Sequence, residues 1–478
     1  MKRISILLFI LFTCLTAATA WAGSHIVYVP PPKGTDETAN IQAALDACVA
    51  YGEDCTVQLA AGTYRTSQLV TYNFQGSFKG MGQTKTTIQA LPNLLVTLSD
   101  ALTQGECKPD TKVCLWPSLI IFVDGNITVS DLTIDEPNVP ATQPWYGAGL
   151  EYTCLNDGIR FMGRNRTNAS VQRVTVKGAP YTSATSCSGD PSIPDFNLCD
   201  ATIFAGEFPK SQTPFDYYFI SGTFSVSNSF FRNVQVGVGA DGFLRDSRIT
   251  IGGSPLAGNI FKNVDFGPLL LSAQNSVEEI SFNTSSGNVV PVMIAPWQDV
   301  FVPSKPSLFS VHDNSLTSSG SAYSIYLQDD PTNHWLYALA YNNTINAQDV
   351  VNDAIGAVFT TATTIIKNKL SGSGQDGVGI YDGSYAAVLE NDVTGFSPNP
   401  GFAQIVLDGS LFGLPDTSNS AVVCKTTSDT VMDLGTNDKV IGCQQVTATS
   451  EAASRKAAPA VLKPRPGLPK GKPWLRQR

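Results

Sequence analysis

The sequence predicts an all-β chain that folds as a right-handed parallel β-helix of about ten coils. The main observation is a short phrase, in which Asn usually stands between apolar residues, that returns from Phe224 to Phe396. Its marked positions are Ser229, Asn259, Asn283, Asn314, Asn343, Asn368 and Asn391, separated by 30, 24, 31, 29, 25 and 23 residues. A period of this size, made of short strands and turns with hardly any helical pattern, indicates a solenoid in which each repeat is one coil. The right-handed sense follows because parallel crossovers are almost always right-handed.

The repeated Asn has a physical role in such a coil. The chain must bend sharply between strands, and Asn tolerates left-handed backbone while its side chain bonds neighbouring peptide groups. Stacked coils would align these side chains into an amide ladder. A β-sandwich is the alternative, but its Asn-Gly hairpin signals are nearly missing and the Asn returns in phase.

Residues 1–22 have the pattern of a secretory signal peptide. Two basic residues precede an apolar run from Ile4 to Ala20, and Ala-x-Ala cleavage sites end at Ala20 or Ala22. This run is short for a membrane span, and no later segment is long enough. We therefore expect an exported protein, extracellular or periplasmic, without an integral membrane segment.

Removal of the signal peptide leaves nine of the ten cysteines, which an exported protein can oxidise. Their spacing suggests four local pairs and one free thiol. The pairs are Cys48–Cys55, Cys107–Cys114, Cys187–Cys199 and Cys424–Cys443, and Cys154 is left over. Sequence leaves the connectivity open, because Cys154 lies close enough to Cys187 to compete for it. A zinc site is disfavoured, since no Cys-x-x-Cys pair occurs.

Residues 23–54 are expected to form an N-terminal segment with a capping helix, ahead of a β-helix domain over residues 55–446. The helix is predicted over residues 35–51, where Thr35 or Asp36 would cap it and Ile41 and Leu45 lie on its apolar face. A helix in this place would cover the apolar core and the strand edges that an open solenoid end exposes.

Three motifs near this helix resemble the pectate lyase-like superfamily of right-handed parallel β-helices. They are Ile41-Gln-Ala-Ala-Leu-Asp46, Ala61-Gly62-Thr63-Tyr64 and Gly80-Met-Gly82. Together with the Asn repeats, the likeness covers about residues 35–445. It implies an elongated coil and, more often than not, a carbohydrate ligand. Since the superfamily includes lyases, hydrolases, epimerases and proteins with no known reaction, it assigns no reaction by itself.

Two long connections between coils are expected to wall one side of the rod. The first runs from Asp135 to Asp157 and carries Trp145 and Tyr146, and the second runs from Gly178 to Asp216. Long loops in compact folds are often functional. They indicate a ligand site beside them, although a decorative or oligomer-contact role is the alternative.

A second strand follows each turn, and its outward residues are candidate sugar contacts. If Ile159, Ile325 and Ile380 point inward, alternation directs Arg160, Tyr326 and Tyr381 outward on one face. Sugars stack on exposed aromatic rings and hydrogen-bond to charged groups. The candidate substrate-binding residues are Trp145, Tyr146, Trp297, Tyr326, Tyr381 and Asp382. An ordinary solvated sheet face is the alternative.

For glycoside hydrolysis, two carboxyl groups must flank the scissile bond. Asp329-Asp330 is the best pair by proximity, and the candidate catalytic residues are Asp157, Arg160, Asp241, Asp329, Asp330 and His334. Asn156-Asp157 and Asp329-Asp330 echo motifs of the polygalacturonase branch. However, His334 lacks its flanking glycines and no Arg-Ile-Lys occurs, which disfavours hydrolysis of that type.

Lyase chemistry would need a base and a counter-charge for a uronate. Arg160 or Arg245 would be the base, and Asp157, Asp241 or Asp246 would hold calcium. No diagnostic motif supports this set. An Arg beside an Asp is more commonly a surface ion pair. Calcium is therefore the one cofactor considered, and no metal ligand is assigned.

Charge restricts the partners. The chain has a net charge of −9. The signal peptide contributes +2, and residues 447–478, a basic and Pro-rich tail predicted to be disordered, contribute +7. The body between them therefore carries −18. Such a body disfavours nucleic acid, and it disfavours polyanionic glycans unless a cation bridges them. The sequence predicts a secreted polysaccharide-active protein, either a lyase or a hydrolase. The alternative is a non-catalytic carbohydrate-binding or surface-attachment β-helix.

Overall fold

The computed structural model describes most of the chain between residues 25 and 447. The described residues are 25–91, 118–135, 144–147, 150–153, 157–178, 203–206, 208–209, 217–234, 236–240, 244–264, 266–271, 274–288, 290–295, 305–320, 323–329, 336–408 and 417–447. They contain one helix, α2 (Thr38–Tyr51), and a sheet of 31 strands. The predicted all-β class is thereby confirmed.

The large sheet consists of three parallel ladders, which we name sheets I, II and III. Sheet I comprises β1 (His25–Val29), β2 (Cys55–Leu59), β4 (Leu69–Lys79), β6 (Ser118–Asp135), β9 (Asp157–Lys177), β13 (Thr223–Ser227), β16 (Arg248–Ile251), β19 (Val277–Ser281), β22 (Ser307–His312), β25 (Leu336–Tyr341), β27 (Thr363–Ile366), β29 (Ala387–Leu389), β32 (Ala421–Val423) and β34 (Lys439–Ile441).

Sheet II takes parts of β6 and β9 together with β3 (Gly62–Thr66), β5 (Thr86–Ala90), β14 (Phe230–Arg232), β17 (Ile260–Lys262), β20 (Thr284–Asn288), β23 (Ser315–Ser319), β26 (Thr344–Val358), β28 (Lys369–Tyr381) and β30 (Asp392–Pro398). Sheet III takes parts of β4, β6, β9, β26 and β28 together with β10 (Ile203–Gly206), β15 (Val236–Ala240), β18 (Phe266–Leu271), β21 (Val292–Ala295), β24 (Ile325–Gln328), β31 (Ile405–Asp408), β33 (Thr430–Asp433) and β35 (Gln444–Gln445).

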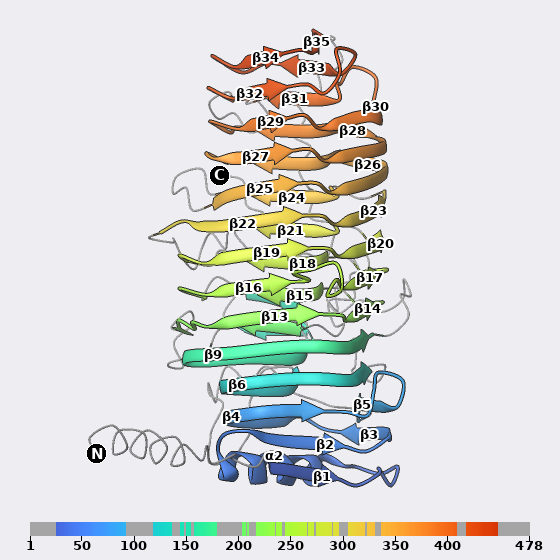
Figure 1. Ribbon diagram of the computed structural model, residues 1–478, viewed down its shortest axis with the longest axis vertical. Helices are drawn as coiled ribbons and strands as arrows, with labels where there is room; N and C mark the ends of the chain where they lie inside the picture. The colour runs from blue at the N-terminus through green and yellow to red at the C-terminus, as the bar shows by residue number, and fades with distance from the viewer. Residues whose placement is uncertain are drawn as a thin grey trace, which may run out of the picture.

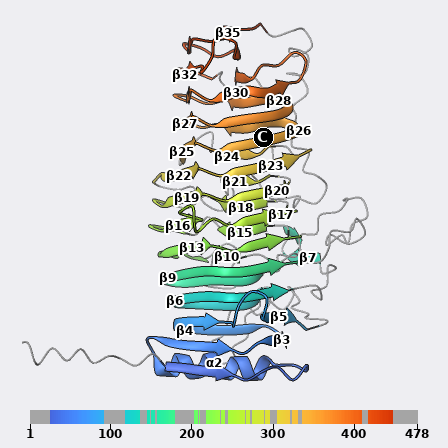
Figure 2. The same cartoon turned by 45° about the vertical axis from the view of Figure 1, so that its right-hand side comes forward.

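The three sheets wind into a stack of coils that rises from the N-terminal to the C-terminal end (Figure 1). In the coils from β2 to β31, sheet I is followed by sheet II and then sheet III, whereas in the last coils β32 and β34 lead directly to β33 and β35 of sheet III; the path is right-handed. The stack is elongated in both views (Figure 2). Each strand pairs with the equivalent strand one coil away, which is the hydrogen-bonding pattern of a parallel β-helix.

The core runs through the middle of the coils. Along sheet I, parallel register aligns Val226, Ile251, Ile280 and Val311, and each is at most 5% exposed. Aromatic rings stack in the same way, with Phe231 and Phe261 centroids 4.9 Å apart. Burying such side chains stabilises the fold by about 1.5–3 kcal/mol each.

The predicted amide ladder is confirmed. Asn314 donates from Nδ2 to Oδ1 of Asn343 at 2.9 Å and to the Ile280 carbonyl at 2.9 Å, while its Oδ1 accepts the backbone N–H of Asn283 at 2.9 Å. The same contacts run from Asn259 to Asn391, all at most 2% exposed. The ladder therefore satisfies polar backbone groups at the turn between sheets I and II.

The reason expected for Asn at these positions is wrong in one respect. The left-handed residue of each turn is the one before the ladder Asn, as at Phe282 (φ 59°), Asp313 (φ 54°) and Lys367 (φ 55°). Asn is thus used for its buried amide, and the strained backbone position accepts several residue types.

Helix α2 lies at the N-terminal end of the stack, beside β1 and β2 (Figure 1). Its buried residues are Ile41, Ala44, Leu45 and Cys48, and Cys48 forms a disulfide with Cys55 of β2. The N-cap residue is Glu37 rather than the expected Thr35 or Asp36, although the Asp36 carboxylate accepts the Thr38 N–H at 2.9 Å. No described helix has the length and hydropathy needed to cross a membrane.

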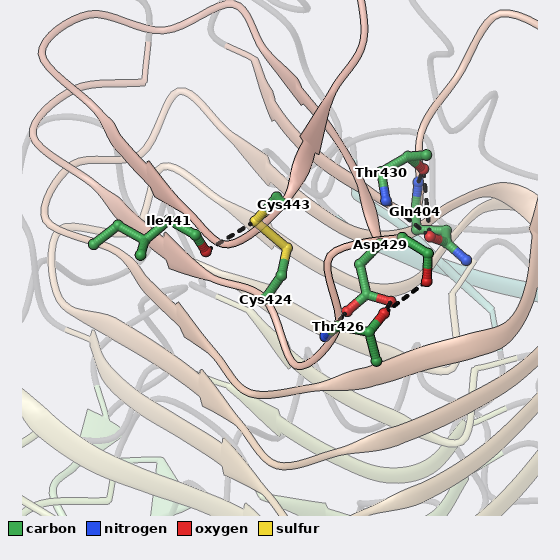
Figure 3. Close-up of a disulfide and its surroundings, with 8 residues drawn as sticks. Gln404, Cys424, Thr426, Asp429, Thr430, Ile441 and Cys443 are labelled. Carbon is green, nitrogen blue, oxygen red and sulfur yellow. Dashed lines mark hydrogen bonds between the residues drawn. A yellow bond between two sulfur atoms is a disulfide. The ribbon is translucent and has the colours of Figure 1, made fainter.

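A second predicted disulfide, Cys424–Cys443, ties together the last coils (Figure 3). Close to it, the Thr430 N–H donates to Gln404 Oε1 at 2.9 Å, and Thr426 donates to the Asp429 carboxylate at 2.7 Å. Two of the four expected pairs are therefore confirmed. The expected pairs Cys107–Cys114 and Cys187–Cys199, and the free Cys154, lie outside the described residues.

Parts of the two long connections form short hairpins. Strands β7 (Pro144–Gly147) and β8 (Leu150–Thr153) pair antiparallel, as do β11 (Phe208–Pro209) and β12 (Tyr217–Tyr218). Residues 203–206 of the second connection form β10 of sheet III, and the rest of both connections lies outside the described residues.

Candidate functional site

Sheet III carries the strands from which the sequence predicts a ligand-binding face. The predicted stretches correspond to β9, β21, β24, β28 and β31. Along β24, Ile325 and Leu327 belong to the central core, whereas Tyr326 between them lies in a second apolar cluster. Successive side chains of a strand point to opposite faces, so Tyr326 stands on the outer side of the coil.

Arg160, Tyr326 and Tyr381 share this outer side, but none is open to solvent. Parallel register connects Arg160 to Tyr326 in one outward column, through Phe204, Gly239, Leu269 and Met293. Tyr381 lies in the next column. The three residues are 1%, 6% and 3% exposed, so they form a covered layer and not an open aromatic surface.

Two glycines make room within this layer. Gly356 and Gly379 follow Tyr326 in the same column on the next two coils. A Cβ at Gly356 would lie 2.5 Å from Tyr323 Cε1 and 3.1 Å from Asp353 Oδ2, and one at Gly379 would lie 2.4 Å from Tyr381 Cε2. The two missing side chains leave a recess that tyrosine rings and a carboxylate fill.

Two carboxyl groups meet in the recess. Asp353 and Asp376 are register partners on neighbouring coils, and both are 0% exposed. The Tyr381 hydroxyl lies 2.8 Å from Asp353 Oδ1 and 3.0 Å from Asp376 Oδ2. Asp353 Oδ2 and Asp376 Oδ1 have no hydrogen-bond partner among the described residues. The pair is therefore close together, dry and incompletely satisfied.

Burial perturbs the protonation of this acid pair. It raises the pKa of Asp353 well above its ordinary value, and the nearby charge of Asp376 raises it further. Burial also raises the pKa of Asp376, to about 7, while hydrogen bonds from Tyr381 and Gln375 act in the opposite direction. Like charges this close cannot both remain ionised, so the pair holds at least one proton at neutral pH.

Tyrosines surround the pair. The Tyr323 and Tyr326 rings lie 4.5 Å apart, and the Tyr326 hydroxyl donates to Gln328 Oε1 at 2.9 Å. Burial raises the pKa of Tyr323 and Tyr381 well above the ordinary value, and the charge of Asp353 adds to the shift. All the tyrosine hydroxyls therefore remain protonated and available as donors.

Within the described part of the chain, no basic side chain pairs with these acids. No Lys, Arg or His of the described residues forms an ion pair with Asp353 or Asp376. The described residues also contain no group of three or more His, Cys, Asp or Glu side chains that could hold a metal ion. The negative charge of the acid pair is thus reduced by protonation and stabilised by hydroxyl donors.

Four other predicted residues are described, and seven are wholly or partly undescribed. Asp329 is 0% exposed at the end of β24, and Asp382 takes a left-handed backbone (φ 49°) after β28. The Arg245 guanidinium lies over the Phe219 ring, 4.0 Å from its centroid, and the Asp246 carboxylate accepts a hydrogen bond from Asn275 Nδ2. Asp241, Trp297, Asp330 and His334 lie outside the described residues, and the side chains of Trp145, Tyr146 and Asp157 are not described.

Sequence reasoning named Tyr326 and Tyr381 as candidate sugar contacts but did not name Asp353, Asp376 or Tyr323. A signal for the acids does exist, because Asp353 and Asp376 each precede a strand glycine by three residues, and the Asp-x-x-Gly pattern returns after one coil of 23 residues. Such a pattern places two carboxyl groups at equivalent positions of adjacent coils.

Comparison with known proteins gives no family model and no curated protein that matches this sequence. Several solved structures align along most of the chain. The mannuronan C-5 epimerase AlgE4 A-module of Azotobacter vinelandii is 15% identical, with 87% of this chain and 94% of that chain covered and a TM-score of 0.41. DFA-IIIase from Arthrobacter chlorophenolicus A6, without its lid, is 13% identical, with 85% and 95% covered and a TM-score of 0.47.

The enzymatically active domain of bacteriophage CBA120 tailspike protein 2 is 11% identical, with 82% of this chain and 50% of that chain covered and a TM-score of 0.44. Values this low carry no conclusion about activity. The parallel ladders themselves establish that the chain has the fold of the superfamily its sequence resembles, the right-handed parallel β-helix.

Proposed function

We propose that this protein is an exported glycan-processing enzyme, and that Asp353 and Asp376 are its acid pair. The observation that carries the proposal is the sharing of one tyrosine hydroxyl by two buried carboxyl groups, at 2.8 and 3.0 Å. Perturbed carboxyl groups concentrate at functional sites. Glycoside hydrolysis needs two such groups, one protonated and one ionised, about 5–5.5 Å apart in retaining enzymes.

The charge of the recess favours hydrolysis over β-elimination. A lyase must neutralise the carboxylate of a uronate, with a cation or a positively charged side chain. The described recess offers two carboxyl groups and tyrosine hydroxyls instead, and it would repel a uronate. We therefore propose a neutral polysaccharide as the substrate.

The two carboxyl groups would take different roles. The member of the pair that holds the proton would be the general acid, and the ionised member would be the carboxylate that acts as base or nucleophile. Tyr381 would position both groups through its hydroxyl. The rate should fall at low pH, as the ionised member becomes protonated, and at high pH, as the protonated member loses its proton.

The complete burial of the pair favours one alternative. A carboxyl pair with 0% exposure must be uncovered before a glycan can reach it. A non-catalytic binding or surface-attachment protein would not need to uncover the pair. In that case the shared proton would only stabilise the packing of β26 against β28.

The test compares Asp353→Asn and Asp376→Asn with Asp349→Asn in the mature full-length protein. Asp349 is an exposed residue of the same strand as Asp353. Reducing ends released from a panel of neutral polysaccharides should fall at least about 100-fold in the first two variants and stay unchanged in the third. Folding of each variant is verified by circular dichroism.

Two results would contradict the proposal. Product with the absorbance of unsaturated uronates, from an acidic polysaccharide, would make the protein a lyase. Full activity in both Asp353→Asn and Asp376→Asn would place the chemistry elsewhere. The residues then to be tested are the remaining sequence candidates, which we keep as proposals: Asp157, Arg160, Asp241, Asp329, Asp330 and His334 for catalysis, and Trp145, Tyr146, Trp297, Tyr326 and Asp382 for sugar contact.

We also propose that the chain is exported after cleavage behind Ala20 or Ala22, and that α2 caps the β-helix. Two disulfides support oxidation outside a reducing compartment. The four buried residues of α2 at the end of the stack support the cap. N-terminal sequencing of the exported protein tests the cleavage.

A further inference from the structure

An apolar ridge lies on the outer side of sheet I, which is a different face of the coil from the acid pair. Val277, Leu308 and Tyr337 are register partners on β19, β22 and β25, and they are 46%, 47% and 48% exposed. Strands of one sheet stack about 4.8 Å apart, so the three side chains form a continuous row. The strands that carry them are seen from the outside in Figure 1.

A rigid polar row begins beside this ridge, at Glu279 two residues beyond Val277 on β19, and continues along the strands to His312, four residues beyond Leu308 on β22. His312 Nδ1 lies 2.8 Å from Asp313 Oδ2, and His312 Nε2 lies 3.5 Å from Glu279 Oε1. The His312 ring stacks on the Tyr341 ring, with centroids 4.5 Å apart. Glu279 is held in turn by the Ser281 hydroxyl at 2.8 Å. The side chains are therefore fixed before any ligand arrives, which lowers the entropic cost of binding.

Exposure and charge together indicate what this surface would bind. The ridge offers apolar and aromatic contact, and the neighbouring Glu279 offers a carboxylate acceptor that is 23% exposed. A pyranose ring has an apolar face and a rim of hydroxyl donors, which matches both rows. Two carboxylates beside one His disfavour an anionic ligand such as a uronate polymer or a nucleic acid.

We propose that the outer side of sheet I is a second glycan-binding surface, at which a neutral oligosaccharide lies on Val277, Leu308 and Tyr337 and donates a hydroxyl to Glu279. The surface would hold the polymer while the acid pair of sheet III acts on it. This inference shares with the proposed function the premise that the partner is a glycan, but it does not need catalysis.

Affinity gel electrophoresis of the mature full-length protein tests the proposal. The gels contain hydroxyethyl cellulose, glucomannan or laminarin as neutral probes, and alginate or polygalacturonate as acidic ones. We expect retardation by at least one neutral polymer and none by the acidic ones. Tyr337→Ala and Glu279→Gln should weaken this binding about tenfold, the loss typical of one good contact.

Tyr28→Ala is the matched control, because Tyr28 is 71% exposed on β1, at the far end of the same sheet. Asp353→Asn should also leave retardation unchanged. Equal binding by Tyr337→Ala and Tyr28→Ala, or no retardation of the wild type in any neutral gel, would overturn the proposal.

Two further outcomes separate the alternatives. A dimer in sedimentation equilibrium that Tyr337→Ala dissociates would make the ridge a contact between copies and overturn the proposal. Retardation without product would support this surface while contradicting the proposed enzyme. Product formation, together with unchanged retardation of Tyr337→Ala, would support the proposed enzyme and contradict this binding surface.

Discussion

Glu278 is the residue that departs furthest from the apolar pattern of the core. It is an inward residue of β19, aligned with Ile249 and Phe309 on the neighbouring coils, and it is 1% exposed. Neither of its carboxyl oxygens has a hydrogen-bond partner in the described part of the chain. Burial alone raises its pKa well above the ordinary value, so Glu278 is neutral in the folded protein.

We predict that Glu278→Gln stabilises the protein and that the gain grows with pH. A carboxyl group with a raised folded pKa costs nothing below its unfolded pKa of about 4.3, where both states are protonated. Above that pH the unfolded state loses the proton and the folded state keeps it, so stability falls by about 1.4 kcal/mol per pH unit until the folded pKa is reached. The substitution removes this loss.

Urea unfolding between pH 4 and pH 8 measures the effect. Glu279→Gln is the control, because Glu279 is the adjacent residue on the outer side of the same strand, with a side chain 23% exposed. Since the acid pair contributes to the same slope, the quantity of interest is the difference between wild type and variant. A difference that does not change with pH would show that Glu278 is ionised in the folded protein.

At the scale of elements, α2 is the part whose role depends most on its position. Ile41, Ala44 and Leu45 are at most 5% exposed, and the apolar core of the coils lies beneath them. The N-cap residue Glu37 makes no side-chain cap bond and the first turn has no acidic residue, so the stability of the helix derives mainly from packing and from the Cys48–Cys55 disulfide.

We predict that Leu45→Asp opens the N-terminal end of the solenoid. A charge buried without a partner costs several kcal/mol, and the uncovered core and strand edges would associate with other molecules. Aggregation measured by light scattering, together with binding of a hydrophobic dye, should rise strongly. Ala43→Asp places the same charge on the exposed side of α2 and should change neither measurement. Monomeric, dye-negative Leu45→Asp protein would argue against the capping role.

At the scale of the whole molecule, the coil stack determines the shape. Among the described residues, sheet I is an unbroken ladder of fourteen strands from β1 to β34. At about 4.8 Å between strands, this ladder is roughly 60 Å long.

Small-angle scattering of the mature protein should therefore give a pair-distance distribution of a rod, with one short cross-sectional distance and a long tail. Circular dichroism should show strand with little helix, because α2 is a single helix of 14 residues in the described chain. A compact, symmetric distribution or a helix-rich spectrum would contradict the fold.

The sequence alone determined the features that repeat with the coil. The ladder from Asn259 to Asn391 and the inward apolar positions follow from a local pattern that every coil imposes on the next, so their spacing was sufficient to predict the fold. The local disulfides Cys48–Cys55 and Cys424–Cys443 were predictable for the same reason, since few residues separate their partners.

Only the tertiary structure decided which acids meet and which residues are covered. Alternation placed Tyr326 and Tyr381 on the outer side, but it does not reveal that a second apolar cluster buries them there. Asp353 and Asp376 became a pair because Gly356 and Gly379 leave space in one column, and because register aligns two coils to the residue. Burial and proton sharing depend on everything that packs around a side chain, which a pattern along one chain does not contain.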